Sequence, residues 1–136
     1  LEYLAEKQQL IIPLHPRTKA KLQDISYPFN KSNISFIEPI GYFEMLYLLQ
    51  YCSLVLTDSG GLQKEAYFFG KQCITLRNET EWVELVENKV NVLAGTDSRN
   101  IIHAAEQMRS IQTQFPQSLY GDGKAAQQIC QRLMKY

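Results

Sequence analysis

The alternation of two kinds of apolar pattern constrains the fold of this chain most. Five short apolar runs alternate with longer segments in which apolar residues recur every three or four positions. Such alternation is typical of parallel strands joined by right-handed helical crossovers. Strands are expected at residues 10–14, 34–37, 54–57, 73–76 and 90–93. Because these runs are almost continuously hydrophobic, helices are expected on both faces, which predicts a three-layer α/β fold with a parallel sheet.

Helices are expected between and after these strands. The predicted ranges are 18–24, 42–52, 62–69, 81–87, 98–111 and 123–135, and residues 2–8 look like the end of a further helix. Gly70 follows one of these helices as a C-terminal cap would. One predicted helix carries a buried apolar stripe at residues Ile101, Ile102, Ala105, Met108 and Ile111.

The C-terminal part of the chain lacks the alternating apolar pattern at its start. Residues 112–123 contain Pro116, Gly121 and Gly123, which are typical of a loop. Residues 1–136 are therefore interpreted as one domain, and residues 112–136 are a candidate for a segment that crosses over to another domain.

The composition points to a small-molecule partner. The 136 residues are 45% hydrophobic, which fits one soluble globular domain. Fourteen basic residues balance fourteen acidic ones without runs of like charge, so no nucleic acid or anionic membrane is expected as a partner. The apolar runs are far shorter than the ~20 residues of a membrane span. No targeting segment is visible, and a cytoplasmic location is expected.

The cysteines and histidines predict neither disulfides nor a metal site. Cys52, Cys73 and Cys130 are odd in number and have apolar neighbours, which is typical of reduced core thiols in a cytosolic protein. His15 and His103 lie far from any cysteine at ligand spacing. We therefore expect no metal and no cofactor.

The strongest local motif lies at residues 57–66, where an apolar strand runs through two glycines into a helix. Gly60 and Gly61 would let backbone N–H groups approach an anion closely, and Ser59 adds a hydroxyl donor. The motif matches neither a P-loop nor a dinucleotide fingerprint. It is compatible with a phosphate site, and equally with a tight turn.

Glu65 lies one helical turn beyond Gly61 and so on the same face as the proposed anion site. A carboxylate there would repel a bare phosphate, but it could accept hydrogen bonds from the two hydroxyls of a ribose beside the phosphates. The alternative is a solvated acid favoured by the dipole at the start of the helix.

His15 lies between Pro13 and Pro16, directly after the first predicted strand and at the ligand-bearing edge of the sheet. It could donate to a phosphate or sugar oxygen, or transfer a proton near neutral pH. An ordinary loop histidine is the alternative. Arg17 and Arg77 are further phosphate candidates, although a loop arginine can also be solvated or ion-paired.

Residues 76–84 form a third strand-to-helix connection. Thr80 is placed to cap the helix, with Glu81 and Glu84 in its first turn, and capping explains these residues without a ligand. Trp82 is expected to attach this helix to the core.

Four segments in this order resemble the C-terminal domain of non-hydrolysing UDP-N-acetylglucosamine 2-epimerases: residues 15–17, 57–66, 70–81 and 120–123. The resemblance covers nearly the whole chain. It implies the second Rossmann-like domain of a glycosyltransferase-B type enzyme, which holds UDP between two domains. The chain starts at Leu1, which is not a Met, so it is expected to be part of a longer protein.

The resemblance also implies roles for single residues. Ser59, Gly60 and Gly61 would hold the diphosphate, Glu65 the ribose hydroxyls, and His15 would face the diphosphate and the sugar as a catalytic residue. The family removes the proton at sugar C2, expels UDP from C1, re-protonates the glycal on the other face and adds UDP back. The carboxylates for proton transfer would lie in the other domain, so this chain alone is expected to be inactive. The complete enzyme is expected to be a homodimer.

Two differences from the family's sequence pattern leave more than one sugar as the candidate substrate. Trp82 and Val83 stand where many members have Arg-Pro, and Met45 stands where others have an aromatic near the base. Together with residues 41–46 they resemble the branch that includes 2,3-diacetamido-2,3-dideoxyglucuronate epimerases.

Other classes of function are compatible with parts of this sequence. A UDP-sugar glycosyltransferase or a hydrolysing epimerase would also bind UDP. A nucleotide-sugar sensor or a flavodoxin-like signalling domain is the non-enzymatic alternative, but a receiver-type domain needs an acidic cluster at strand ends, where only Asp58 lies.

Overall fold

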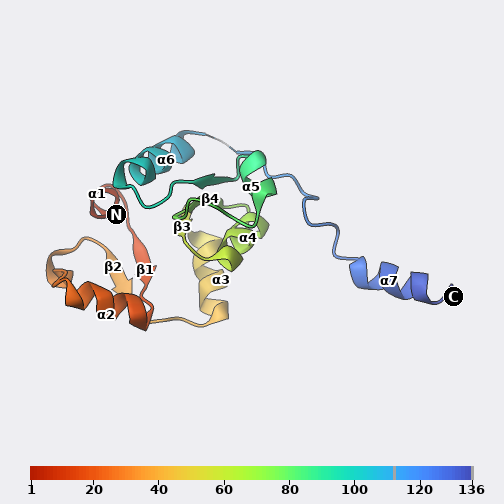
Figure 1. Ribbon diagram of the computed structural model, residues 1–136, viewed down its shortest axis with the longest axis horizontal. Coiled ribbons are helices and arrows are strands. Elements are labelled where there is room, and N and C mark those ends of the chain that lie inside the picture. The colour runs from red at the N-terminus through yellow and green to blue at the C-terminus, as the bar shows by residue number, and fades with distance from the viewer. Residues whose placement is uncertain (112, 136) are drawn as a thin grey trace.

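The predicted alternation of strands and helices is present in the computed structural model, which describes residues 1–111 and 113–135 (Figure 1). In chain order the elements are α1 (Glu2–Ala5), β1 (Ile11–Pro13), α2 (Pro16–Asp24), the short 3-10 helix η1 (Phe29–Lys31), β2 (Ser35–Ile37), α3 (Tyr42–Tyr51), β3 (Leu54–Thr57), α4 (Gly60–Phe68), β4 (Gln72–Thr75), α5 (Val83–Glu87), β5 (Asn91–Leu93), α6 (Ser98–Ser110) and α7 (Ala125–Leu133).

The strands pair in parallel, which confirms the predicted α/β class. They form two hydrogen-bonded sheets: β1 pairs with β2, while β3, β4 and β5 form a sheet with β4 in the centre. In the larger sheet Cys73 of β4 lies between Val55 of β3 and Asn91 of β5. Each of these strands therefore directs its carboxyl end toward the same edge.

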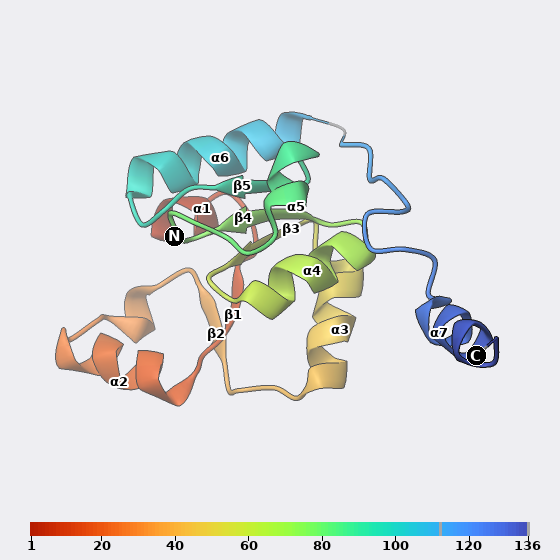
Figure 2. The same cartoon turned by 45° about the vertical axis from the view of Figure 1, so that its right-hand side comes forward.

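Helices cover both faces of the larger sheet, as expected (Figure 2). Neighbouring residues of a strand point to opposite faces, and β4 shows this: Ile74 packs with α1 and α6, while Cys73 packs with α3 and α4. The buried residues of the first cluster are Leu4, Ile74, Ala94, Ala104, Ala105 and Met108. Those of the second are Leu49, Val55, Ala66 and Cys73.

Both ends of α4 are fixed by local sequence. At its start, Ser59 is the N-cap residue. At its end, Gly70 adopts a φ of 63°, and the N–H of Lys71 donates to the carbonyl of Ala66 at 2.8 Å. This left-handed glycine closure is the predicted C-terminal cap. Because both ends are fixed, the start of α4 has a defined position at the carboxyl edge of the sheet.

Residues 113–121 lie against α4 and α5. Tyr67 donates a hydrogen bond from its hydroxyl to the carbonyl of Pro116. The third core cluster consists of buried Tyr67, Leu85 and Val90 with partly buried Trp82, Phe115, Leu119 and Tyr120 around them. The chain therefore adds a layer of aromatic packing before it reaches α7.

Two expectations for the last part of the chain were wrong. Ile111 is not part of the buried stripe, because α6 ends at Ser110 and Ile111 is 58% exposed. Cys130 is not a core thiol: α7 stands away from the domain body (Figure 1) and has no buried residue. Cys73 is buried and Cys52 half-buried, and burial raises the pKa of the Cys73 thiol to about 12.

Several helix limits also differ from the predicted ones. The helix expected at 62–69 begins two residues earlier, at Gly60, because glycines directly after an N-cap serine can enter the first turn. The helix expected at 81–87 begins only at Val83. In the described part of the chain, none of the helices combines the length and apolar character that crossing a bilayer requires.

Candidate functional site

The predicted site residues lie in the connections that leave the carboxyl ends of strands or in the first two turns of the helices that follow. His15 and Arg17 follow β1, Ser59 follows β3, and Arg77 follows β4. In open α/β sheets this edge is where ligands bind. The His15 loop belongs to the two-stranded sheet and the other two loops to the three-stranded one, and within residues 1–111 and 113–135 no hydrogen bond joins the His15 loop to the Ser59 loop.

The start of α4 has the chemistry of an anion site. The N–H of Ser59 donates to Thr57 Oγ1 at 3.0 Å, and Ser59 Oγ accepts a long bond of 3.5 Å from the N–H of Leu62. The hydroxyl hydrogen of Ser59 remains available as a donor. The first N–H groups of a helix have no acceptor inside the helix, and the helix dipole adds partial positive charge there.

The two glycines have different surroundings. A Cβ added to Gly60 would lie 3.3 Å from Glu81 Oε2, so the side chain of Glu81 leaves little room there. A Cβ added to Gly61 would meet only Ser59 Oγ, at 3.9 Å. The Glu81 carboxylate is the flexible end of an exposed side chain and could move aside, so packing does not require glycine at position 60, and Gly61 leaves an open approach to the backbone for a ligand.

Gln63 is fully buried beneath this loop and was missed by the sequence analysis. Its amide nitrogen donates to the Ser59 carbonyl at 3.3 Å. Its amide oxygen accepts from Thr80 Oγ1 at 2.6 Å and from Asn91 Nδ2 at 2.9 Å. The sequence signal that indicates its burial is its position, because Gln63 lies on the same helical face as buried Ala66.

The network continues into the sheet. Thr75 and Asn91 are both buried, and the Thr75 hydroxyl donates to Asn91 Oδ1 at 2.9 Å. Each side-chain amide and hydroxyl in this chain of bonds has a partner, and a fully satisfied buried network holds its members rigidly. The connections after β3 and β4 are thereby joined through Gln63 to the first residue of β5.

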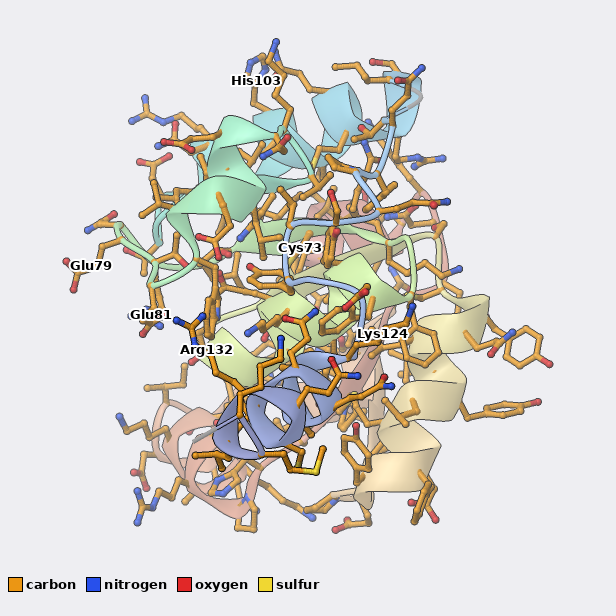
Figure 3. The ribbon with its side chains drawn as sticks, turned by 90° about the vertical axis from the view of Figure 1, so that its right-hand side faces the viewer. Cys73, Glu79, Glu81, His103, Lys124 and Arg132 are labelled. Atoms are coloured by element: carbon orange, nitrogen blue, oxygen red, sulfur yellow. The ribbon has the colours of Figure 1, made fainter. Side chains whose placement is uncertain are left out.

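Arg77 faces a protein carboxylate. Its guanidinium lies 3.1 Å from Glu81 Oε1 and 3.4 Å from Oε2. The pKa of Glu81 is lowered, first by its own backbone N–H and then by Arg77. Glu79 and Glu81 project from the β4–α5 loop at the edge of the domain (Figure 3). A ligand phosphate would have to share Arg77 with Glu81.

His15 is the N-cap residue of α2. Its Nδ1 accepts from the N–H of Arg17 at 3.2 Å, and Pro16 occupies the first helical turn. Because Nδ1 accepts, the proton of the neutral ring resides on Nε2. The exposed ring thus presents an N–H donor on its free side.

Glu65 is half-buried on α4, one turn beyond Gly61. Among the described residues its carboxylate makes no hydrogen bond or ion pair with another side chain. Glu65 therefore keeps its full capacity to accept hydrogen bonds from a ligand, as the ribose hypothesis requires.

Thr80 has another role than the one expected, whereas Trp82 packs against the core beside Leu85 of α5, as predicted. The N-cap residue of α5 is Trp82, so the prediction that Thr80 caps this helix was wrong. Thr80 lies too far before Val83, and its hydroxyl oxygen instead accepts from the N–H of Trp82 at 3.1 Å while the hydroxyl donates to Gln63. The Trp82 indole donates from Nε1 to the carbonyl of Gly60 at 2.8 Å.

A family model described as UDP-N-acetylglucosamine 2-epimerase matches residues 1–134. The chain belongs to this UDP-N-acetylglucosamine 2-epimerase family. The UDP-2,3-diacetamido-2,3-dideoxy-D-glucuronate 2-epimerase of Pseudomonas aeruginosa is 45% identical over 126 residues, which cover 93% of this chain and 35% of that protein. The UDP-N-acetylglucosamine 2-epimerase of Methanocaldococcus jannaschii is 40% identical over 130 residues, covering 93% and 35%.

Solved structures agree with this family assignment. The UDP-GlcNAc 2-epimerase of Methanocaldococcus jannaschii superposes with a TM-score of 0.83 at 36% identity, over 96% of this chain and 37% of that one. The same enzyme in complex with UDP-GlcNAc and UDP superposes with a TM-score of 0.80, also at 36% identity and over the same shares. This epimerase-family chain spans about a third of the length of its curated relatives.

In this epimerase-family domain, Gln63→Leu is expected to lower the free energy of unfolding by about 2–5 kcal/mol. The substitution leaves the buried Asn91 amide and the half-buried Thr80 hydroxyl without their partner, and an unsatisfied buried group costs about 1–3 kcal/mol. Gln107→Leu, at an exposed position of α6, is the matched control and should change stability by no more than about 0.5 kcal/mol. Urea denaturation of both variants measures the difference; equal losses would show that the network does not stabilise the fold.

Proposed function

We propose that this chain is the UDP-binding half of an enzyme that interconverts UDP-N-acetylglucosamine and UDP-N-acetylmannosamine. The start of α4 carries the proposal. There the Ser59 hydroxyl and the N–H groups of Gly60 and Gly61 have no acceptor among the described residues, at a helix N-terminus that buried Gln63 holds in place. Membership of an epimerase family, one member of which is described in complex with UDP-GlcNAc and UDP, supports the same conclusion.

The diphosphate would lie against the first turn of α4. N–H groups at a helix start and a serine hydroxyl are suited to phosphate oxygens. Glu81 brings a negative charge close to Gly60, and the ion pair with Arg77 offsets it. Arg77 would contribute mainly through this pair, and the exposed Arg17 would add positive charge from the His15 loop.

The ribose would lie beside Glu65. Its carboxylate stands one turn beyond Gly61 and is not engaged by other described side chains. A sugar attached to a phosphate at the helix start would bring its two hydroxyls to this position. Two hydrogen bonds to one carboxylate are the arrangement that dinucleotide-binding folds use for ribose.

His15 would act from the neighbouring loop. Its Nε2 is free, because Nδ1 caps α2. An Nε2–H donor can stabilise negative charge on the diphosphate while UDP leaves sugar C1. Removal and return of the C2 proton would depend on carboxylates outside this chain.

A second candidate is a UDP-2,3-diacetamido-2,3-dideoxyglucuronate 2-epimerase. The identity of 45% to the Pseudomonas aeruginosa enzyme, against 40% to the Methanocaldococcus jannaschii one over a similar length, favours it. Both candidates share the UDP site and the reaction at C2. They differ in the sugar, and the sugar would contact the part of the enzyme outside this chain.

The proposal extends to the complete enzyme. We infer a two-domain glycosyltransferase-B type architecture in which residues 112–136 cross to the other domain. The exposed apolar residues Ile129, Leu133 and Met134 of the α7 region support this, because they require a surface to pack against. By resemblance, the enzyme would be a cytoplasmic homodimer in bacterial polysaccharide biosynthesis, and sedimentation of the complete protein would test the dimer.

Glu65→Ala is expected to weaken UDP binding about 10- to 100-fold and to leave binding of inorganic pyrophosphate unchanged. Only UDP offers the ribose hydroxyls, and hydrogen bonds to a charged acceptor contribute about 1.5–3 kcal/mol each. Calorimetry with both ligands measures the effect, with Glu87→Ala on exposed α5 as the control. An equal loss of affinity for both ligands would show that Glu65 does not bind the ribose.

His15→Asn in the complete enzyme is expected to lower the rate of epimerisation by at least about 10-fold. Positioned donors and acid–base groups typically supply this much or more. Asparagine also serves as an N-cap, so α2 should keep its start. An unchanged turnover number in this variant would show that His15 serves only as the N-cap of α2.

The chain alone is expected to bind UDP weakly and to catalyse no exchange at C2. One wall of the site would be missing, so water would weaken its electrostatic contacts. The test is incubation of the purified chain with UDP-N-acetylglucosamine in deuterated water, followed by proton NMR of C2. Deuterium incorporation at a rate comparable to that of the complete enzyme would show that the proton-transfer groups belong to this chain.

A further inference from the structure

The indole of Trp82 is bonded to the backbone of the proposed diphosphate site. Its Nε1 donates to the carbonyl of Gly60 at 2.8 Å. This carbonyl belongs to the peptide group whose N–H is that of Gly61. In a trans peptide the carbonyl and the N–H point in opposite directions. A bond that holds the carbonyl on the protein side therefore directs the N–H of Gly61 away from Trp82 and out of the helix start.

The helical bonding of α4, which begins at Gly60, already holds this peptide, and the Trp82 bond adds a second restraint at the point where two glycines adjoin. Glycine has no Cβ and populates both signs of φ, so a Gly–Gly peptide turns over at little steric cost. A turned peptide would present the carbonyl of Gly60 to an anion in place of the N–H of Gly61. The carbonyl oxygen would then repel the phosphate that the N–H attracts.

Trp82 is itself held on several sides. The amino group of Lys64 lies 4.2 Å from the centre of the indole ring and 4.2 Å from that of Tyr120. Tyr120 meets the indole edge to face, with ring centres 6.1 Å apart and an angle of 88°. The backbone N–H of Trp82 donates to Thr80 Oγ1, which belongs to the Gln63 network. The indole donor is thus fixed before any ligand binds.

We propose that Trp82 is a positioning residue for the diphosphate: its indole N–H fixes the Gly60–Gly61 peptide so that the Gly61 N–H faces the ligand. The inference rests on the proposed UDP site. Trp82 acts through the backbone and need not touch UDP. Because the effect is on the phosphate donors, it should be the same for every ligand with a diphosphate, whatever sugar or nucleoside is attached.

The test uses the whole 136-residue chain with two ligands, inorganic pyrophosphate and UDP. Trp82→Phe removes the N–H donor and keeps an aromatic ring near Lys64. Replacement of Trp82 by benzothienylalanine, in which sulfur takes the place of the N–H, keeps the full ring shape in case Phe packs poorly. Tyr51→Phe, which removes an exposed hydroxyl on α3, is the control.

Both Trp82 replacements are expected to weaken the binding of pyrophosphate and the binding of UDP by the same factor, about 3- to 10-fold, as measured by calorimetry. The control should bind both ligands as the parent does. This pattern differs from that of Glu65→Ala, which affects UDP alone. In NMR spectra without ligand, the amide signals of Gly60 and Gly61 should shift and broaden in both replacements, since their peptide loses its restraint.

The proposal has a spectroscopic signature of its own. Trp82 is the only tryptophan in the sequence, so its indole N–H gives a single resonance. That resonance should be protected from hydrogen exchange and should move when pyrophosphate binds. If the parent chain binds both ligands and each replacement binds them with the affinity of the parent, the positioning role is overturned and the UDP site stands. If the parent chain binds neither ligand, the UDP site itself is wrong.

Discussion

The hydrogen bonds of buried Gln63 are the interaction on which the site depends. A buried amide is costly unless its donors and acceptor are satisfied. Gln63 meets this requirement only when the Ser59 carbonyl, Thr80 and Asn91 all lie around it. The connections after β3 and β4 and the start of β5 are therefore held at fixed separations by one side chain. The helix start above Gln63 is shaped before a ligand arrives, and preorganised donors bind and stabilise negative charge most effectively.

Charge around this helix start is balanced within the protein. Two carboxylates lie close to a site proposed for an anion. Glu81 is paired with Arg77, so its repulsion of a phosphate is reduced. Glu65 has no such partner among the described residues. A ligand that carries a diol beside its diphosphate fits this asymmetry, because the Glu65 carboxylate can accept from both hydroxyls without competing with a cation among the described residues. The arrangement fits a nucleoside diphosphate better than a simple phosphate.

Residues 113–121 connect this site to the C-terminal end of the chain. Tyr120 packs on Trp82 and shares the amino group of Lys64 with it, and Tyr67 bonds to Pro116. Beyond this aromatic layer α7 stands free, with its apolar residues exposed (Figure 1). The segment that leaves the domain is thus anchored beside the residue that restrains the Gly60–Gly61 peptide.

The sequence by itself determined the parallel α/β class, the order of strands and helices, and the loops that form the site. These features are local: apolar periodicity reports which face of a segment is buried, and glycines mark where a backbone is accessible. Only the tertiary structure decided that Gln63 bonds to Asn91, 28 residues away, and that Trp82 bonds to Gly60, 22 residues away. It also decided that Arg77 faces Glu81 and that Cys130 is exposed. A pattern along the chain records the burial of a residue but carries no distances between loops, and the partner of a buried polar group depends on those distances.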